Sequence, residues 1–347
     1  MTDAPLRVVQ WATGNIGMRA LQGVIAHPAL ELAGVLVYDP AKDGVDAGVL
    51  AGVDPIGVTA SADREKVIEC DADCALYMPR ALDVDDLVAL LERGTNVVTT
   101  CGELHDGGRP LGEPARARVV EACTRGGSSI YATGSSPGFI TDALPFALLS
   151  LQRRVDLVEI DEFADLSRRD SPHLLFELMG FGRAPEAYDA RRAGALVSAF
   201  APALTELARA AGRPVDEWIG DGEVAVARSA TTIAAGRIEA GTVAAQRTTI
   251  VGRSQGRDVV RLRPTWYCTA DVDPAWELQS TGWRVQVHGD APLDVRIDFP
   301  VALDDLGAFT PGYTAHRPVN AVPYVCAAPP GILATADLPA ITPAGRA

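Results

Sequence analysis

A glycine turn near the start of the sequence could bind the phosphates of a dinucleotide. Residues 12–17 read ATGNIG, the Gly-x-Gly-x-x-Gly pattern with alanine in the first place. In this pattern Gly14 lets the backbone approach the pyrophosphate, and Gly17 lets the next helix pack closely on the preceding strand. Amide groups and the dipole at a helix N-terminus attract anions. The predicted cofactor ligands here are Thr13, Gly14, Asn15, Ile16 and Gly17.

The choice between NAD and NADP depends on the residues after the next predicted strand. Asp39 could accept hydrogen bonds from the ribose hydroxyls, which favours NAD, whereas Lys42 could pair with a 2′-phosphate, which favours NADP. Asp39 precedes Pro40, so it could also simply begin a turn. Both residues are therefore candidate cofactor ligands, and the choice stays open.

Glu103 is the candidate catalytic residue. Ligands of a doubly wound sheet bind at the carboxyl ends of its strands, so a strand ending at Cys101 brings Cys101, Gly102 and Glu103 near the nicotinamide. Reductive amination passes through an iminium cation. A carboxylate can stabilise that cation and carry protons while ammonia adds and water leaves. The alternative to a catalytic role is that Glu103 is an ordinary loop carboxylate in solvent. His105 is expected at the surface or as a capping residue.

A second strand end, residues 132–139, also presents glycine and small polar residues to the expected nicotinamide. Gly134 is the predicted cofactor contact in this segment. Ser135 and Ser136 are expected to serve a turn or bind backbone, because no base is spaced to activate them as nucleophiles.

Alternating strands and helices must position these residues. Strands are expected at residues 6–12, 30–38, 73–78, 96–101 and 129–133, with helices at 15–27, 83–93 and 113–125. Such alternation favours a parallel, doubly wound sheet. The fold class is therefore α/β, with an N-terminal Rossmann domain over residues 1–140.

The regular alternation of predicted strands and helices ends after Gly134. Helices are expected at residues 139–152 and 191–211, and strands at 155–164, 223–234, 242–251, 258–268, 283–288 and 294–301. Consecutive strands with short links favour an antiparallel sheet, so residues 141–312 are predicted to form an α+β domain. A last helix at 315–327 should bend or start late because of Pro318 and Pro323, and an irregular tail from Pro329 should follow it.

Composition excludes several classes of partner. The 347 residues carry a net charge of −14, which repels nucleic acid. The six cysteines form no Cys-x-x-Cys pair and the five histidines are scattered, so no metal site is expected. No signal peptide and no apolar run of membrane-spanning length is visible. The expectation is a cytoplasmic protein with reduced thiols and no membrane partner.

The motifs resemble those of a known family. Residues 8–17, 99–103, 134–139 and 241–247 are similar to the dihydrodipicolinate-reductase-like family, and closest to its branch of 2,4-diaminopentanoate dehydrogenases and native NAD(P)H-dependent amine dehydrogenases. The resemblance spans most of the chain, and the Cys-Gly-Glu segment is its most telling part. It implies reductive amination of small aliphatic ketones or aldehydes with ammonia, and the reverse deamination of primary amines, with Glu103 as the catalytic residue.

The resemblance also implies an architecture and a pocket. The second domain would hold the substrate and, through an open sheet, form a homodimer. A C-terminal helix and tail, residues 313–347, would return to the Rossmann domain. The apolar pocket would be lined by Phe139, Ile140, Thr141, Phe163 and Phe176. Ordinary core packing is the alternative for these aromatic side chains.

The chain departs from true dihydrodipicolinate reductases, which carry paired histidines and a lysine in the second domain. Residues 159–166 contain neither, so that activity is not expected. A dicarboxylate substrate would need an arginine clamp, for which only Arg168 and Arg169 stand nearby. Two other functions stay open: an imine or carbonyl reductase that does not use ammonia, and a dinucleotide sensor without turnover.

Overall fold

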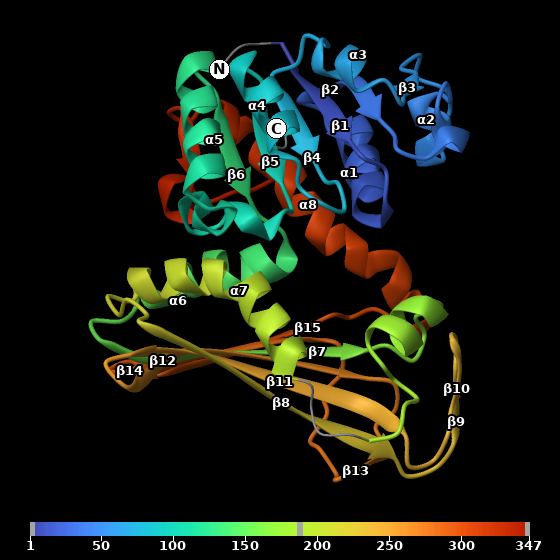
Figure 1. The fold of residues 1–347 in the computed structure, drawn as a ribbon, viewed down its shortest axis with the longest axis vertical. Coiled ribbons are helices and arrows are strands. Elements are labelled where there is room, and N and C mark those ends of the chain that lie inside the picture. Colours follow the sequence, from blue (N-terminus) through green and yellow to red (C-terminus); the bar gives the residue numbers. More distant parts are fainter. Residues whose placement is uncertain (1–3, 186–189, 344–347) are drawn as a thin grey trace. The chain divides into compact units, whose positions relative to one another are not determined.

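The chain folds into two compact units (Figure 1). In the computed structural model, which describes residues 4–185 and 190–343, unit 1 draws on Met1–Phe139 and Thr310–Ala347, and unit 2 on Ile140–Phe309. Among the described residues, no helix combines the length and the apolar character needed to cross a bilayer.

Unit 1 is built on a parallel sheet of seven strands in the order β16-β6-β5-β4-β1-β2-β3. Every residue of β4 and β6 is buried, as expected for strands that helices cover on both faces. The predicted doubly wound α/β fold is confirmed. The strands are β1 (Leu6–Trp11), β2 (Leu30–Leu36), β3 (Ala60–Ser61), β4 (Cys74–Tyr77), β5 (Asn96–Thr99), β6 (Ser129–Ala132) and β16 (Gly331–Leu333).

Helices cover this sheet on two sides. Neighbouring residues of β1, Val8 and Val9, belong to two separate cores because side chains alternate between the faces of a strand. Helices α1 and α8 contribute to the first core, and α4 and α5 to the second. The helices of unit 1 are α1 (Asn15–Ala26), α2 (Ala47–Ala51), α3 (Arg64–Ile68), α4 (Val84–Glu92), α5 (Glu113–Gly126) and the larger part of α8 (Leu306–Cys326).

The C-terminal segment differs from the prediction in two ways. Helix α8 begins at Leu306 rather than Ala315 and runs through Pro311, Pro318 and Pro323. Each proline removes one helical hydrogen bond, but the helix is held by buried side chains such as Val319 and Val322. The tail is not irregular throughout, since β16 pairs with β6 in parallel. A strand of three residues that follows two prolines carries no periodic signal.

Unit 2 contains a mixed sheet of seven strands in the order β13-β8-β11-β12-β7-β14-β15. The prediction of an antiparallel sheet is wrong at one pair, because β7 and β12 run parallel. These strands are joined through α7, β8 and β11 rather than by a hairpin. The strands are β7 (Val155–Asp165), β8 (Glu217–Ala227), β11 (Val243–Ser254), β12 (Arg257–Tyr267), β13 (Val272–Asp273), β14 (Gly282–Gly289) and β15 (Leu293–Asp298).

Two further elements of unit 2 correct the sequence analysis. The strand predicted at 223–234 is divided between β8 and β9 (Thr231–Ile233), and β9 pairs with β10 (Gly236–Ile238) in a separate two-stranded sheet. The helix predicted at 139–152 is regular only in α6 (Leu144–Leu149). The preceding turn, Ser135–Ala143, is distorted, with Gly138 at a φ of 124°.

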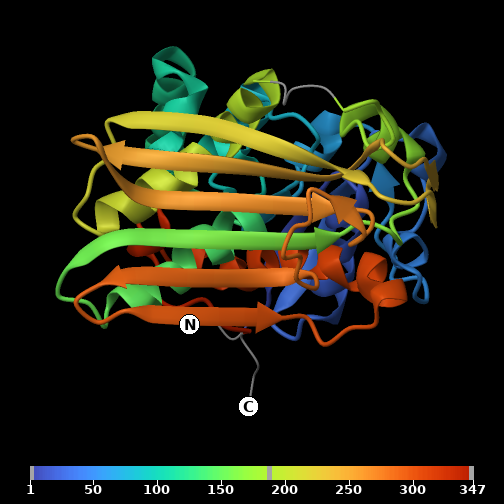
Figure 2. The same ribbon diagram turned by 90° about the horizontal axis from the view of Figure 1, so that it is seen from below.

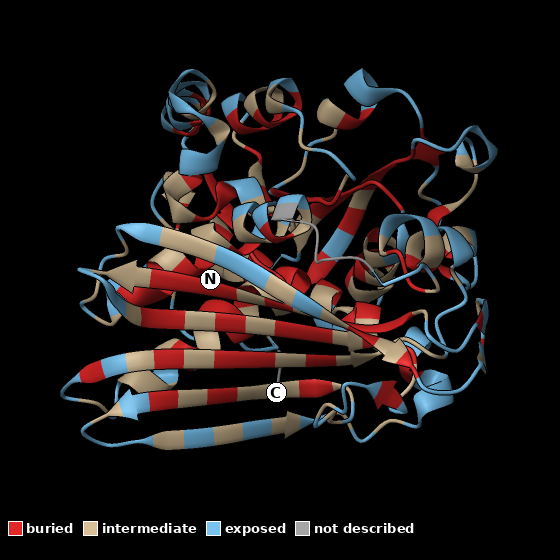
Figure 3. Ribbon diagram, turned by 60° about the horizontal axis from the view of Figure 1, so that its bottom comes forward, coloured by how far each residue is buried: buried red, intermediate tan, exposed pale blue. Residues whose placement is uncertain are grey.

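The two faces of the mixed sheet differ. Helix α7 (Ala190–Ala210) packs on β8 and β11, where a side chain on Gly220 would meet Val197. Gly220 lies in register with Ile250, Leu262 and Ile160 across the sheet, so Glu159 and Asp161 point to the opposite face. Figure 2 shows the strands uncovered along most of their length on that side, and Figure 3 shows buried and less buried positions mixed along them.

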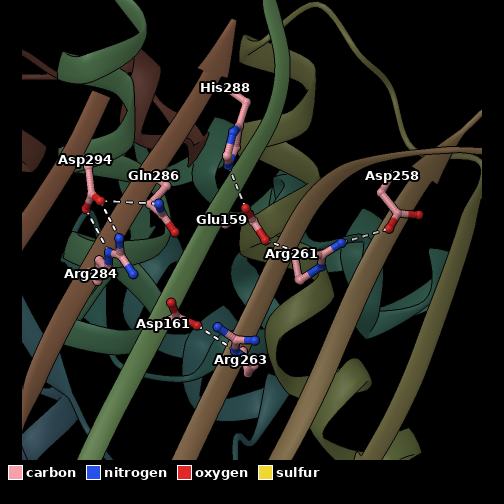
Figure 4. A network of polar contacts seen from close by, with 9 residues as sticks. All are labelled: Glu159, Asp161, Asp258, Arg261, Arg263, Arg284, Gln286, His288 and Asp294. Atoms are coloured by element: carbon pink, nitrogen blue, oxygen red, sulfur yellow. Dashed lines mark hydrogen bonds and ion pairs between the residues drawn. The ribbon is translucent and has the colours of Figure 1, made fainter. Parts of the chain in front are cut away.

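The uncovered face carries a network of charged side chains (Figure 4). Asp161 accepts from Arg263 at 2.7 Å between Oδ1 and Nε, and Asp294 accepts from Arg284 at 2.8 Å. The arginine partners lower the pKa of Asp258 and Asp294. The network consists of Glu159, Asp161, Asp258, Arg261, Arg263, Arg284, Gln286, His288 and Asp294.

Candidate active site

The glycine turn is held by close backbone packing. Ala12 takes the left-handed conformation with φ of 74°, in the place where the pattern has glycine. The buried side-chain amide of Gln10 donates to the Ala12 carbonyl at 2.9 Å. A Cβ on Gly17 would clash with that carbonyl oxygen, whereas a Cβ on Gly14 would meet nothing within 4 Å. Gly17 therefore serves packing, and Gly14 leaves open space in front of the helix.

The N-terminus of α1 offers free backbone donors. Gly14 is the N-cap residue. Among the described residues no side chain caps the helix, and its first turn contains no acidic residue. Gly14 and Asn15 are exposed, Ile16 is half-buried, and Thr13 is buried. This arrangement fits a pyrophosphate group, because uncapped amides and the helix dipole both favour an anion.

The structure brings Lys42 to the glycine turn. Its ammonium donates to the Thr13 carbonyl at 2.9 Å and lies 3.3 Å from the Thr13 hydroxyl. Asp39 uses one carboxylate oxygen to accept from the Ala41 amide at 3.0 Å, which caps the 3₁₀ turn Pro40–Lys42. Asp39 is thus a turn residue, and its other oxygen faces no partner in the described part of the chain.

Unit 1 also contains a cavity of about 700 Å³ at the carboxyl ends of β1, β2 and β4. Its wall includes Trp11 and Tyr38, whose side chains are joined by a hydrogen bond of 3.0 Å from the indole N–H to the phenol oxygen. Arg64, also in the wall, pairs with Asp86, and burial raises the pKa of that carboxyl. Sequence reasoning missed this cavity, although Trp11 stands directly before the glycine turn.

Glu103 lies beyond the end of β5, in the 3₁₀ turn Gly102–Leu104. The turn is anchored by the fully buried Leu104 and by a hydrogen bond of 3.0 Å from the Cys101 amide to the Thr99 hydroxyl. Glu103 itself is exposed, and its carboxylate contacts no hydrogen-bond or ion-pair partner among the described residues. Burial raises the pKa of Cys101 to about 11, so its thiol is protonated at neutral pH.

The predicted surface position of His105 is wrong. The residue does stand at the N-cap of the 3₁₀ turn Asp106–Leu111, but its side chain makes no capping hydrogen bond. It is 4% exposed, and burial lowers its pKa to about 4, so the imidazole is neutral at pH 7. The chain reverses immediately after it, where Asp106, Gly107 and Gly108 all have positive φ. This reversal turns the side chain of His105 toward the interior, and no local sequence pattern predicts the reversal.

The end of β6 lies beside the end of β5. The Thr133 amide donates to the Thr99 carbonyl at 2.8 Å, and Gly134 follows as a buried residue. A Cβ on Gly134 would lie 3.1 Å from the Pro137 carbonyl oxygen. Helix α8 reaches this turn with Thr314 and Arg317, which sequence reasoning missed because nothing local links them to β6.

The five predicted pocket residues are divided between the units. Phe139 ends the first segment of unit 1 and is half-buried. The other four belong to unit 2, where Ile140 and Thr141 are fully buried and Phe163 is 6% exposed on β7. Phe176 packs in a core of unit 2, close to Gly236. Of the two arginines considered as a clamp, Arg168 pairs with Asp304 at 2.8 Å.

Known proteins resemble the chain over its whole length. Residues 139–345 match the family model described as the 2,4-diaminopentanoate dehydrogenase C-terminal domain. An amine dehydrogenase of Streptomyces virginiae is 29% identical over 356 residues, 98% of each chain. The solved amine dehydrogenase of Mycobacterium smegmatis aligns with a TM-score of 0.76 at 19% identity, again over 98% of both chains. A probable dehydrogenase of Thermotoga maritima reaches 0.59 at 13% identity, over 96% of this chain and 92% of that one.

These findings confirm the predicted fold class and the predicted class of enzyme, an NAD(P)-dependent oxidoreductase. The family match covers the greater part of the chain and includes all of unit 2. The chain belongs to the 2,4-diaminopentanoate dehydrogenase family.

Proposed function

We propose that the protein is an amine dehydrogenase, which converts a small aliphatic ketone or aldehyde and ammonia to a primary amine and also catalyses the reverse deamination. The observation that carries this proposal is Glu103, an exposed carboxylate at the carboxyl edge of the parallel sheet that has no partner within residues 4–185 and 190–343. The names of the relatives from Streptomyces virginiae and Mycobacterium smegmatis support the same reaction.

The proposed cofactor is NADPH or NADH. Residues 13–17 would hold its pyrophosphate, and the cavity beside Trp11 and Tyr38 would receive the adenosine. Asp39 and Lys42 would face the ribose, where a carboxylate favours NAD and an ammonium favours NADP. Titration with each cofactor decides between them. The proposed contacts at the nicotinamide end are Cys101, Gly102 and Gly134.

Glu103 would act on the substrate through charge and proton transfer. The bound nicotinamide supplies the hydride. The carboxylate stabilises the iminium cation that forms from the carbonyl and ammonia, and it carries protons during addition and dehydration. The Cys101 thiol takes no part as a nucleophile because it stays protonated. Phe139, Ile140, Thr141, Phe163 and Phe176 are proposed to form the apolar lining that excludes water.

Replacement of the carboxylate by an amide tests this assignment. We expect Glu103→Gln to lower kcat for reductive amination by at least about 100-fold, because the charge is lost while the shape is kept. The Kd of NADPH, measured by fluorescence titration, should stay within about twofold. Glu121→Gln, an exposed carboxylate on α5, is the matched control and should keep full activity. Full activity of Glu103→Gln contradicts the proposal.

The assay also separates the competing functions. Equal reduction of the carbonyl with and without ammonia would identify a carbonyl reductase instead. Tight cofactor binding without hydride transfer to any carbonyl, with or without ammonia, would identify a sensor. Each assay is run with NADPH and NADH, and in reverse with primary amines.

A homodimer through the uncovered face of the unit 2 sheet is part of the proposal. That face carries both signs of charge in alternation, so two copies related by a twofold axis could pair them. Light scattering measures the mass in solution. We expect a dimer that Arg284→Glu weakens, and a monomeric parent chain would contradict it.

A further inference from the structure

We propose that Arg317 is a positioning residue for the hydride end of the site. It holds the turn after β6, and through that turn the surface on which the nicotinamide would rest. This inference depends on the proposed function, since it assigns a task to the same edge of the sheet. It adds a residue from α8, far away in the sequence, to the site.

The guanidinium of Arg317 lies against three residues at the two ends of the turn that follows β6. Its Nε donates to the Thr133 hydroxyl at 2.8 Å, and one terminal nitrogen lies 3.4 Å from the Tyr131 hydroxyl. Its central carbon lies 6.0 Å from the centre of the Phe139 ring. The planar group therefore spans both ends of the turn, from the last residues of the strand to the start of the predicted pocket.

Within the described part of the chain, no acidic side chain pairs with Arg317. The side chain is half-buried, and in residues 4–185 and 190–343 no carboxylate lies within ion-pair distance of it. By contrast, Arg263 and Arg284 both pair with aspartates. Both hydrogen bonds of this half-buried guanidinium to described residues go to neutral hydroxyl groups, so they add little Coulomb stabilisation. Its directional hydrogen bonds are what distinguish it from an apolar side chain of the same length.

A second contact from α8 holds the same turn. The Thr314 hydroxyl, one helical turn before Arg317, lies 2.7 Å from the Ser135 hydroxyl. The chain folds tightly here, since a Cβ on Gly138 would lie 3.0 Å from the Thr133 hydroxyl oxygen. Side chains of helix α8 thus form hydrogen bonds with residues on both sides of Gly134, the predicted cofactor contact.

Position along the sheet predicts which step Arg317 affects. The turn follows β6, which is separated from β1 and its glycine turn by β5 and β4. A loosened turn would leave the pyrophosphate site intact but misplace the reacting carbon, and an error of about 1 Å can cost about 100-fold in rate. We therefore expect a loss in kcat without an equal loss in cofactor affinity.

The test is a double-mutant cycle between Arg317 and Thr133. Arg317→Met keeps the length without donors, and Thr133→Val keeps the shape without the hydroxyl. Each should lower kcat about 10- to 100-fold and raise the deuterium isotope effect with 4-deuterated NADPH, while the Kd of NADPH changes less than about threefold. The double variant should lose little more than either one. Arg317→Lys, which keeps one donor, should recover part of the rate.

Arg118→Met, an arginine on α5 that pairs with Asp85, is the control and should behave as the parent. The proposal is overturned if Thr133→Val keeps the parental rate, if the two losses multiply, or if affinity falls as much as kcat. Thr133→Val alone decides the matter if Arg317→Met does not fold. A parent chain that transfers no hydride contradicts the proposed function instead, so the two failures are distinct.

Discussion

The two seven-stranded sheets of this protein place their polar residues differently. In the parallel sheet of unit 1, β4 and β6 are buried throughout, and buried polar side chains such as Thr99, Thr133 and Gln10 stand at or near the carboxyl ends of strands. In the mixed sheet of unit 2, charges are spread along one whole face. The proposed site thus lies at one edge of the first sheet, whereas the charges of the second sheet follow a whole face.

The largest effect should come from a core substitution in unit 1. Leu76, on β4, is fully buried in one of the two cores that flank the sheet. We expect Leu76→Ala to lower the free energy of unfolding by about 2–5 kcal/mol, since it removes apolar contacts and leaves a cavity. Arg284→Ala, on the uncovered face of unit 2, should cost less than about 1 kcal/mol. Urea denaturation measures the free energy of unfolding of both variants. Similar losses for Leu76→Ala and Arg284→Ala would contradict the difference between the two sheets.

An intermediate effect should appear within the charged face itself. Asp161 has a side chain only 7% exposed, whereas its partner Arg263 is 39% exposed. Arg263→Ala leaves a buried carboxylate unpaired and should cost about 1–3 kcal/mol. Asp161→Ala leaves a guanidinium that water can reach, so it should cost less. A larger loss for Asp161→Ala than for Arg263→Ala in urea denaturation would show that the unequal burial of the two side chains does not set the cost.

The smallest effect should be a gain at the glycine turn. Ala12 has a positive φ, which costs a side chain about 1–2 kcal/mol relative to glycine. Ala12→Gly removes that strain but raises the entropy of the unfolded chain, so we expect a net gain of about 0.5–1 kcal/mol. Thermal unfolding gives the measurement. A loss of stability would show that the alanine methyl group contributes packing that outweighs the strain.

Local patterns predicted most of unit 1. Buried parallel strands read as short apolar runs, and the helices between them show a clear period, so residues 6–133 could be divided correctly into most of their elements. The glycine turn and Glu103 followed from that division, because the fold places strand ends at one edge. The short helices α2 and α3 were missed, since five residues are too few for a periodic signal.

Long-range contacts could not be predicted in the same way. Arg317 meets Thr133 only because α8 returns to the parallel sheet, and the burial of His105 depends on a chain reversal at residues 106–108. The parallel pairing of β7 with β12 likewise joins strands far apart in sequence. Such contacts depend on tertiary packing, which a local pattern does not encode.

The return of the chain to unit 1 has a consequence for synthesis on the ribosome. The strand β16 and the second half of α8 emerge only after all of unit 2, yet they cover Tyr131 and complete the edge of the parallel sheet beside β6. Unit 2 is continuous in sequence and can close as soon as it emerges. Unit 1 starts first, but it lacks these core residues until the end of synthesis, so an apolar face of its sheet stays exposed during that interval.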